Sequence, residues 1–418
     1  MMAPGSSPGK PDNPMRIESN TAMASFLDSV PVSAIIKIRD LMHTVKDPFR
    51  LDQGDVSFDA PATVKAAMAR AITENKTHYL PTTGVPRLRE LLTDKMRREN
   101  GIPIGSAEEV VPTNGGTHGL WALMHALFEP GDEVIVSDPE WPATMAIAIA
   151  AKATPVAVPL YEKLGWRWDL DELERAITPR TKAIYVNSPN NPTGGVMTRG
   201  DLVRIAAIAR ERDLWVLSDE AYEHILYEGE HISIASIPGM YERTIPIYTF
   251  SKSYAMTGLR LGYFAVQDST IRARAIKVIA YTTNNVNSVV QYGGIGALEG
   301  SQDCVREYRE ELKARRDLFF AGLHDAAHGI LSGVPPVGAF YAFVKINPAW
   351  ASSTGTTTPS LSWAMAEHLI RNARIGCVPG VDFGPSGEGY LRLAFGRERS
   401  ELQGALASMK QALAIRVH

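Results

Sequence analysis

The feature that most constrains the fold is an alternation, from about residue 60, of helix-period segments with short apolar runs. The clearest runs are "EVIVS" (133–137), "AIYVN" (183–187), "WVLSD" (215–219), "IPIYTF" (245–250) and "LGYFAV" (261–266). Short apolar runs are typical of buried parallel strands, and strands that alternate with helices form a parallel sheet covered by helices. The sequence therefore predicts an α/β fold.

Polar clusters follow four of these runs directly. They lie at 138–141, 187–194, 219–222 and 251–252. In an open α/β sheet, ligands bind at the carboxyl ends of the strands. We therefore expect these four clusters to form one site.

The pattern changes near residue 325, where "GAFYAFVKI", a helix near 361–373, "GYLRLAF" and a final helix from about 399 suggest a separate α+β domain. A chain of 418 residues with 45% apolar residues exceeds what one core usually supports. We predict a large domain over 61–324 and a small domain from 30–60 and 325–418. Residues 1–29, rich in Pro, Ser, Gly and Asn, are predicted to be a disordered or arm-like segment.

Composition excludes several kinds of partner. The net charge of −3 offers no basic face for nucleic acid, and the most apolar stretch, 143–160, is interrupted by Lys152 and Pro155, so no membrane span is predicted. Two cysteines without metal-ligand spacing favour no disulfide framework and no metal site, which fits a reducing cytoplasm. A small-molecule partner is expected.

Lys252 and Arg260 lie close together after the fourth run. A lone lysine at a strand end is usually a solvated charge, but a lysine amine can also form a Schiff base with a carbonyl. Arg260 suits a phosphate, and Thr249 and Ser251 add hydroxyl donors. This loop would hold a carbonyl compound that carries a phosphate, and pyridoxal phosphate is the commonest such cofactor.

Pyridoxal phosphate needs a carboxylate beside its ring nitrogen, and Asp219 ends a strand three residues before Tyr222. Asp219 could equally be a helix N-cap. In "NSPNNPTG", Asn191 could donate to the ring hydroxyl beside Tyr222, although the segment could also be only a tight turn.

Two further groups could complete a cofactor site. Gly115 and Gly116 precede an amphipathic helix, whose first backbone N–H groups and the Thr117 hydroxyl would form an anion site. Trp141 could stack on the cofactor ring, although a tryptophan there is more often plain packing.

Taken together, "NSPNNPTG", "SDEAY", "TFSKSYAMTGLRLGY" and "FGPSGEGYLRLAFG" give a resemblance to the class I/II aminotransferase family of fold-type I pyridoxal-phosphate enzymes, from about residue 33 to the end. The resemblance implies a mostly parallel seven-stranded sheet and a Schiff base on Lys252, which then acts as the base at the substrate α-carbon. It also implies that Arg392 clamps the substrate carboxylate with Asn191 and the backbone of Gly54. Family members are homodimers, and Tyr79 in "THYLPTTGVPRLRE" matches a tyrosine that reaches the neighbour's phosphate.

The predicted reaction is transamination from an L-amino acid to a 2-oxo acid, 2-oxoglutarate being the expected acceptor. A C–S β-lyase and a cyclopropane-forming synthase on the same scaffold are the enzymatic alternatives. A ligand-sensing domain of a transcription regulator is a third alternative, disfavoured because only about 30 mostly polar residues precede the fold and leave no room for a DNA-binding module.

The amino donor is less constrained. Some aspartate-specific family members have a lysine after the Gly-Gly pair, where this chain has Thr117. Trp141, Phe340 and Tyr341 could line a pocket for an apolar side chain, or could be ordinary core residues. We therefore expect a broad enzyme that accepts aromatic or other neutral donors as well as aspartate.

Overall fold

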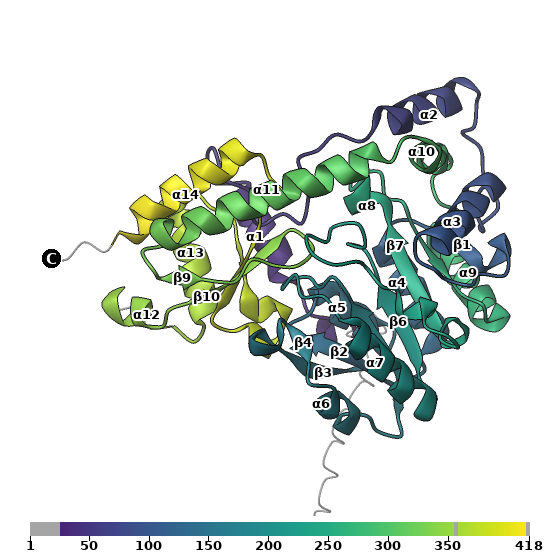
Figure 1. Cartoon of the computed structure of the whole chain (residues 1–418), viewed down its shortest axis with the longest axis horizontal. Coiled ribbons are helices and arrows are strands. Elements are labelled where there is room, and N and C mark those ends of the chain that lie inside the picture. Colours follow the sequence, from purple (N-terminus) through teal and green to yellow (C-terminus); the bar gives the residue numbers. More distant parts are fainter. Residues whose placement is uncertain (1–25, 355–357, 415–418) are drawn as a thin grey trace, which may run out of the picture.

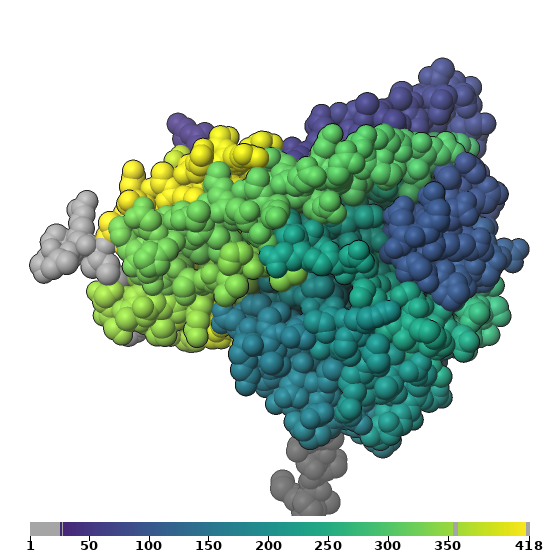
Figure 2. All heavy atoms as spheres, in the orientation of Figure 1, coloured from purple at the N-terminus to yellow at the C-terminus, as the bar shows by residue number. Residues whose placement is uncertain are grey.

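The computed structural model describes residues 26–354 and 358–414, and these contain two sheets that share one long helix (Figure 1). The prediction for residues 1–29 falls outside the described residues except for a short 3-10 helix at Phe26–Ser29. The chain of the large sheet is teal and the chain of the small sheet is green to yellow (Figure 2).

The large sheet has the strand order β1-β8-β7-β6-β5-β2-β3-β4. Its strands are β1 (Val110–Thr113), β2 (Glu133–Asp138), β3 (Thr154–Tyr161), β4 (Arg167–Trp168), β5 (Thr181–Asn187), β6 (Trp215–Asp219), β7 (Thr244–Thr249) and β8 (Gly262–Ala265). Strands β3, β2, β5, β6 and β7 are parallel neighbours. The predicted seven-stranded sheet is therefore present, and the two-residue strand β4 adds an eighth at one edge.

One strand direction differs from the prediction. The run 261–266 was expected among the parallel strands, but β8 pairs antiparallel with both β7 and β1. Only residues 250–261 connect β7 to β8. A parallel neighbour requires a crossover, usually a helix, that returns along the length of the sheet. These twelve residues contain only the four-residue helix α8 (Phe250–Ser253) and turn back at the same edge.

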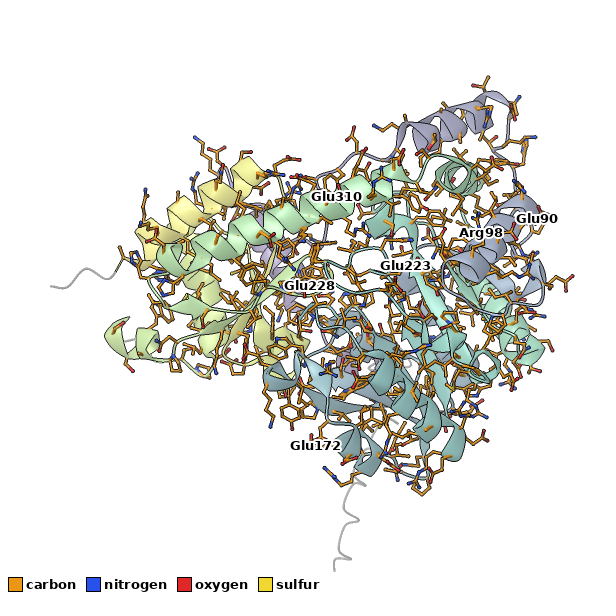
Figure 3. All side chains as sticks on the ribbon, viewed as in Figure 1. Glu90, Arg98, Glu172, Glu223, Glu228 and Glu310 are labelled. Atoms are coloured by element: carbon orange, nitrogen blue, oxygen red, sulfur yellow. The ribbon has the colours of Figure 1, made fainter. Side chains whose placement is uncertain are left out.

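Helices cover both faces of the large sheet. One face packs against α4 (Gly116–Leu127), α5 (Pro142–Ala150) and α9 (Ser269–Thr282). The other packs against α3 (Pro86–Arg98), α6 (Leu170–Arg175), α7 (Arg199–Glu211) and α10 (Ser288–Glu299), and α2 (Ala62–Thr73) lies on α10. On α3, Glu90 and Arg98 are exposed, while the partly buried Glu223 pairs with Lys95 of the same helix (Figure 3).

The small sheet has the order β11-β12-β10-β9, with all neighbours antiparallel. Its strands are β9 (Leu331–Ser332), β10 (Tyr341–Ile346), β11 (Val378–Pro379) and β12 (Tyr390–Ala394). The helices of this part of the chain are α1 (Ala34–Met42), α12 (Ala349–Thr354), α13 (Leu361–Ala373) and α14 (Arg399–Leu413). The two helices predicted near 361–373 and from about 399 are therefore confirmed as α13 and α14.

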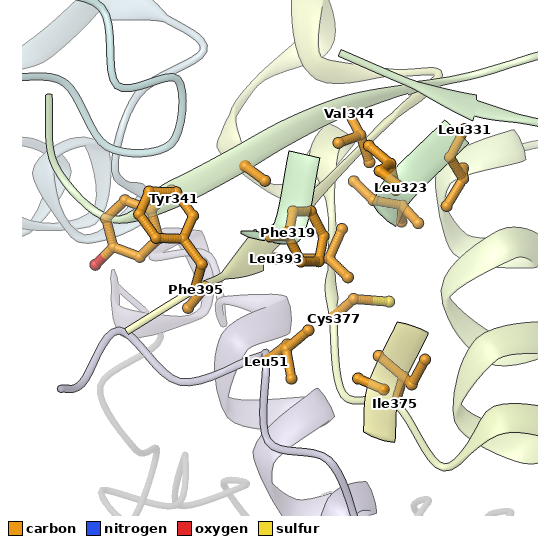
Figure 4. Packing of buried hydrophobic residues seen from close by; sticks show 14 of the residues in the cluster. Leu51, Phe319, Leu323, Leu331, Tyr341, Val344, Ile375, Cys377, Leu393 and Phe395 are labelled. Carbon is orange, nitrogen blue, oxygen red and sulfur yellow. The ribbon is translucent and has the colours of Figure 1, made fainter. Parts of the chain in front are cut away.

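The core of the small sheet also takes in residues that are distant in sequence (Figure 4). Leu51 and Phe319 pack with Leu393 there, and Phe49 bridges to Ile375. Phe319 belongs to α11 (Asp303–Ala326), which runs from the large sheet to the small one (Figure 1). The predicted boundary at 324/325 falls inside α11, and the division into domains stays a prediction.

The four polar clusters do end β2, β5, β6 and β7. Because these strands are parallel neighbours, their carboxyl ends meet at one edge of the sheet, as expected. Over the described residues, none of the helices combines the length and the apolar character needed to cross a membrane.

Candidate active site

A cavity of about 250 Å³ lies at this edge. Eleven of the thirteen predicted site residues line it: Gly54, Gly116, Thr117, Trp141, Asn191, Asp219, Tyr222, Thr249, Lys252, Arg260 and Arg392. They come from both the large and the small sheet. The structure therefore brings together residues that are up to 338 positions apart in the sequence, between Gly54 and Arg392.

Two predicted residues do not line the cavity. Gly115 lies behind it, directly under the guanidinium of Arg260. Tyr79 is 87% exposed on the surface of this chain. A role for Tyr79 in a neighbouring subunit's site stays a prediction.

Lys252 lies in the short helix α8 (Phe250–Ser253), which begins directly after β7 and is capped by the Thr249 side chain. The lysine Nζ donates a hydrogen bond to the Gly54 carbonyl at 2.5 Å. Burial lowers the pKa of Lys252 from 10.5 to about 8, and the nearby guanidinium groups of Arg392 and Arg260 act in the same direction. A larger fraction of this amine is therefore neutral, and able to attack a carbonyl, than for an ordinary lysine.

Arg260 and the start of α4 form a compact anion site. Gly115 has φ 80°, and a Cβ at this position would lie 2.4 Å from Arg260 Nη2. Arg260 itself has φ 59° and donates to the Thr257 carbonyl at 2.8 Å. Glycine is therefore required at 115, because it lets the guanidinium approach the first backbone N–H groups of α4.

Asp219 is the last residue of β6, and it accepts two hydrogen bonds. Ala221 N donates to Oδ1 at 3.1 Å, and the Tyr185 hydroxyl donates to Oδ2 at 2.7 Å. Burial raises the pKa of Asp219, and these two hydrogen bonds oppose the rise. The alternative role as a helix N-cap is wrong, because the residues after Asp219 form turns and no helix begins there.

Arg392, on β12, is a buried guanidinium that is 1% exposed. Its Nη1 donates to Asn191 Oδ1 at 3.3 Å and its Nη2 to the Asp52 carbonyl at 2.6 Å, while Nε has no hydrogen-bond partner among the residues that the structure describes. Since Asn191 Oδ1 faces Arg392, the Asn191 amide Nδ2 is left as a donor.

The aromatic residues expected around the site divide into two groups. Tyr341 lines the cavity, and its hydroxyl shares a 2.8 Å hydrogen bond with that of Tyr222. Trp141 also lines the cavity. Phe340 is fully buried in the core of the small sheet, with its ring centroid 5.5 Å from Lys252 Nζ.

Four other lining residues were not given a role in the site: Ile35, Asn187, Ala221 and Tyr248. Asn187 and Ala221 belong to the clusters 187–194 and 219–222, which were expected at the site, and Tyr248 directly precedes Thr249 at the end of β7. Ile35 comes from α1 and reaches the cavity only because α1 packs against the small sheet. Nothing in its local sequence indicates this.

Glu140 belongs to the cluster 138–141 that was expected at the site, but no role was predicted for it; it is fully buried beside the cavity. Asn187 Nδ2 and Trp141 N each donate to its Oε1 at 2.7 Å, and Ser137 Oγ donates to Oε2. Burial raises the pKa of Glu140 to about 8. The Glu140 carboxyl thus connects two residues that line the cavity, Trp141 and Asn187.

These residues fit pyridoxal phosphate. Lys252 offers a partly neutral amine, and the site formed by Arg260 and α4 offers positive charge for a phosphate. Asp219 offers a buried carboxylate for the ring nitrogen. The α/β fold and this set of donors at its carboxyl edge define a pyridoxal-phosphate-dependent transferase of fold type I.

Comparison with known proteins gives the family. The family model described as "Aminotransferase class I and II" matches residues 46–409, and the chain belongs to this family. It is 37% identical over 395 residues to the aspartate aminotransferase of Pyrococcus abyssi and 35% identical over 395 residues to the aromatic-amino-acid aminotransferase 2 of Thermococcus litoralis. Each match covers 94% of this chain and 98% of the relative.

A solved structure agrees. The aspartate aminotransferase from Thermus thermophilus with maleate superimposes with a TM-score of 0.84 at 36% identity, covering 94% of this chain and 100% of that one. The protein is thus an aminotransferase that uses pyridoxal phosphate and acts on amino acid and 2-oxo acid substrates. The comparisons give no support to the lyase, synthase or ligand-sensing alternatives.

Proposed function

We propose that this aminotransferase moves the amino group of aspartate and of aromatic or other neutral L-amino acids to 2-oxoglutarate. The observation that carries the proposal is an excess of positive charge around the cavity. Lys252, Arg260 and Arg392 all line it, and none forms an ion pair with an Asp or Glu of residues 26–354 and 358–414. Their hydrogen bonds go to uncharged groups, among them the carbonyls of Gly54, Thr257 and Asp52, so ligands with several anionic groups are favoured there.

When bound, pyridoxal phosphate supplies an aldehyde that takes up the amino group and a ring that withdraws electrons from the substrate α-carbon. Lys252 Nζ would bind the aldehyde, and as a base it would move a proton to and from the substrate α-carbon. Arg260, with Gly116, Thr117 and Thr249, would hold the phosphate. Gly115 gives Arg260 the room that it needs.

The remaining side chains orient the ring and the substrate. The Asp219 carboxylate would keep the ring nitrogen protonated, the Tyr222 hydroxyl and the Asn191 amide would donate to the ring hydroxyl, and Trp141 would pack against the ring. Arg392 Nε and the outer faces of its Nη groups bind the substrate carboxylate, beside Gly54. A Cβ at Gly54 would lie 2.7 Å from the Tyr341 hydroxyl, so this wall of the cavity has no room for a side chain.

The broad donor range follows from how the cations are assigned. With Lys252, Arg260 and Arg392 given to the aldehyde, the phosphate and the α-carboxylate, no other Lys or Arg of the described residues lines the cavity. The walls that remain for the donor side chain include Ile35, Trp141 and Tyr341. These favour apolar and aromatic side chains.

The proposal extends to assembly. We infer a homodimer in which Tyr79 reaches the neighbour's phosphate, because Tyr79 lies within the motif "THYLPTTGVPRLRE" and, at 87% exposed, is available for such a contact. The cytoplasmic location expected from the cysteine content stays a prediction.

The test is a half-reaction panel. Purified holoenzyme is mixed with aspartate, phenylalanine, tyrosine, leucine or alanine, without acceptor, while the visible absorbance of the cofactor is followed. We expect the absorbance to shift with each donor and to recover on addition of 2-oxoglutarate, and we expect no shift in Lys252→Ala. An aspartate preference in kcat/KM above about a thousandfold would refute the broad donor range, and normal turnover by Lys252→Ala would refute the site.

A further inference from the structure

Tyr185 is a polar residue in the middle of an apolar strand. It lies in β5, is 0% exposed, and packs among Ala183, Leu217 and Ile245 on the face of the sheet that α4, α5 and α9 cover. By its position it is an ordinary core residue, where phenylalanine would fill the same space. A buried tyrosine hydroxyl, however, needs a hydrogen-bond partner.

The partner of the Tyr185 hydroxyl is Asp219 Oδ2, at 2.7 Å. In the register of β5 and β6, Tyr185 aligns with Leu217, and Asn187 aligns with Asp219. Tyr185 and Asp219 are therefore diagonal neighbours on one face of the sheet. A short side chain cannot span this diagonal, whereas a tyrosine ring places its hydroxyl beside the carboxylate.

The two oxygens of Asp219 are thus held from different directions. Oδ1 is fixed by Ala221 N at 3.1 Å, and Oδ2 by Tyr185. Each carboxylate oxygen can accept two hydrogen bonds, so capacity remains on the side that faces the cavity.

We propose that Tyr185 is a positioning residue that holds the Asp219 carboxylate in its ionised form and aims it at the pyridine nitrogen of the cofactor. The proposal rests on the role proposed above for Asp219. It assigns a function to a side chain that does not itself line the cavity.

Electrostatics support the proposal. Burial raises the pKa of Asp219, and the Tyr185 hydrogen bond acts against the rise because it stabilises the ionised form. Glu220 also raises this pKa and Lys252 lowers it. The ionisable groups that face Asp219 from the surrounding elements are Glu140, Tyr185, Glu220, Tyr222 and Lys252.

The experiment uses Tyr185→Phe, which keeps the ring and removes the hydroxyl. Apoprotein is titrated with pyridoxal phosphate between about pH 5 and pH 8, and the dissociation constant is measured from the quenching of tryptophan fluorescence. Without the hydrogen bond the pKa of Asp219 rises. In a plot of cofactor affinity against pH, the acidic limb, where affinity falls at low pH, should therefore shift to higher pH by about one unit, which makes binding on that limb roughly tenfold weaker. The acidic limb of kcat should move in the same direction.

Tyr241→Phe is the matched control. The Tyr241 hydroxyl also donates to a carboxylate, Glu109 Oε2 at 2.7 Å, and the residue is 3% exposed but lies outside the cavity. This variant should lose thermal stability to a similar extent and leave the acidic limb in place. An acidic limb in Tyr185→Phe that stays at the wild-type position would overturn the proposal and leave Tyr185 a packing residue.

A double-mutant cycle with Asp219→Asn separates this proposal from the proposed function. If Tyr185 acts through Asp219, Tyr185→Phe has little further effect on cofactor affinity in the Asp219→Asn background. An equal effect in both backgrounds would overturn the proposal. If Asp219→Asn alone left affinity and turnover at wild-type values, the assignment of Asp219 in the proposed function would be the one that fails.

Discussion

Burial drives two side chains of the site toward their neutral forms from opposite directions. It lowers the pKa of the Lys252 amine to about 8 and raises the pKa of the Glu140 carboxyl to about 8. A neutral amine suits the role proposed for Lys252. A neutral Glu140 keeps a second negative charge away from Asp219, which interacts with it electrostatically.

The Glu140 carboxyl gives a prediction about stability and pH. Its pKa is 4.5 when unperturbed and about 8 in the fold, so between these values the folded state binds more protons than the unfolded state. The free energy of unfolding therefore falls as pH rises through this window. Glu140→Gln, which carries no charge, should remove this fall, so its stability relative to wild type should increase from about pH 5 to pH 8.

Urea unfolding at several pH values measures this difference. Glu133→Gln is a control of opposite sign, because hydrogen bonds from Thr178 and the Arg180 side chain lower the pKa of the buried Glu133 carboxyl. The stabilisation that the ionised Glu133 carboxylate provides is lost as pH falls, whereas the destabilisation of the fold by Glu140 appears as pH rises. Parallel stability curves for wild type and Glu140→Gln would contradict the prediction.

Among the elements, the short helix α1 contributes Ile35 to the cavity. A nine-residue helix is marginal by itself, so contacts with the rest of the protein must hold it. Asp382 supplies two of them, since Ser33 Oγ donates to its Oδ2 at 2.8 Å and Ala34 N to its Oδ1 at 2.6 Å. Ile35, the next residue, lines the cavity.

Asp382→Ala should therefore change substrate binding rather than the chemical step. We expect the KM for the amino donor to rise roughly threefold to tenfold with little change in kcat, because Ile35 forms a wall for the donor side chain and touches no reacting atom. Steady-state kinetics with phenylalanine as the amino donor would show whether KM rises while kcat stays nearly unchanged.

Asp268→Ala is the control for this experiment. Asp268 caps α9 by accepting hydrogen bonds from Thr270 N and Ile271 N, and it does not line the cavity. Its loss should cost about 1 kcal/mol of stability with no change in KM. If the two variants lose stability equally and both keep the wild-type KM, α1 does not shape the donor site.

At the scale of the whole molecule, the site extends beyond one chain if Tyr79 serves a neighbour. An exposed tyrosine that contributes nothing to its own subunit's cavity is what a shared site in a symmetric dimer requires. In a symmetric dimer each chain would supply its Tyr79 to the other chain's site, so both sites would depend on both chains.

Subunit mixing tests this arrangement. Lys252→Ala and Tyr79→Ala are each expected to be inactive, but a heterodimer of the two would contain one site with both an intact Lys252 and an intact Tyr79. After complete exchange in an equal mixture, about a quarter of wild-type activity should return. Activity no higher than that of the parents, in a mixture shown to exchange subunits, would place Tyr79 in its own subunit's site or outside it.

The sequence by itself determined the parts that depend on local pattern. Apolar runs followed by polar residues located the ends of β2, β5, β6 and β7, and the sheet then had to bring Trp141, Asn191, Asp219 and Lys252 to one edge. This works because a strand of a parallel sheet can be recognised from a few residues, and all such strands point the same way.

Only the tertiary structure decided the parts that depend on long-range contact. The direction of β8 followed from its short connection to β7, and Ile35 entered the site through the packing of α1 against Asp382. Tyr185 gave no local signal, and Glu140 showed only its place in the cluster 138–141, because the role of each depends on a partner from another strand. Which buried polar groups meet is set by how strands and helices pack, and pattern along the chain does not contain that information.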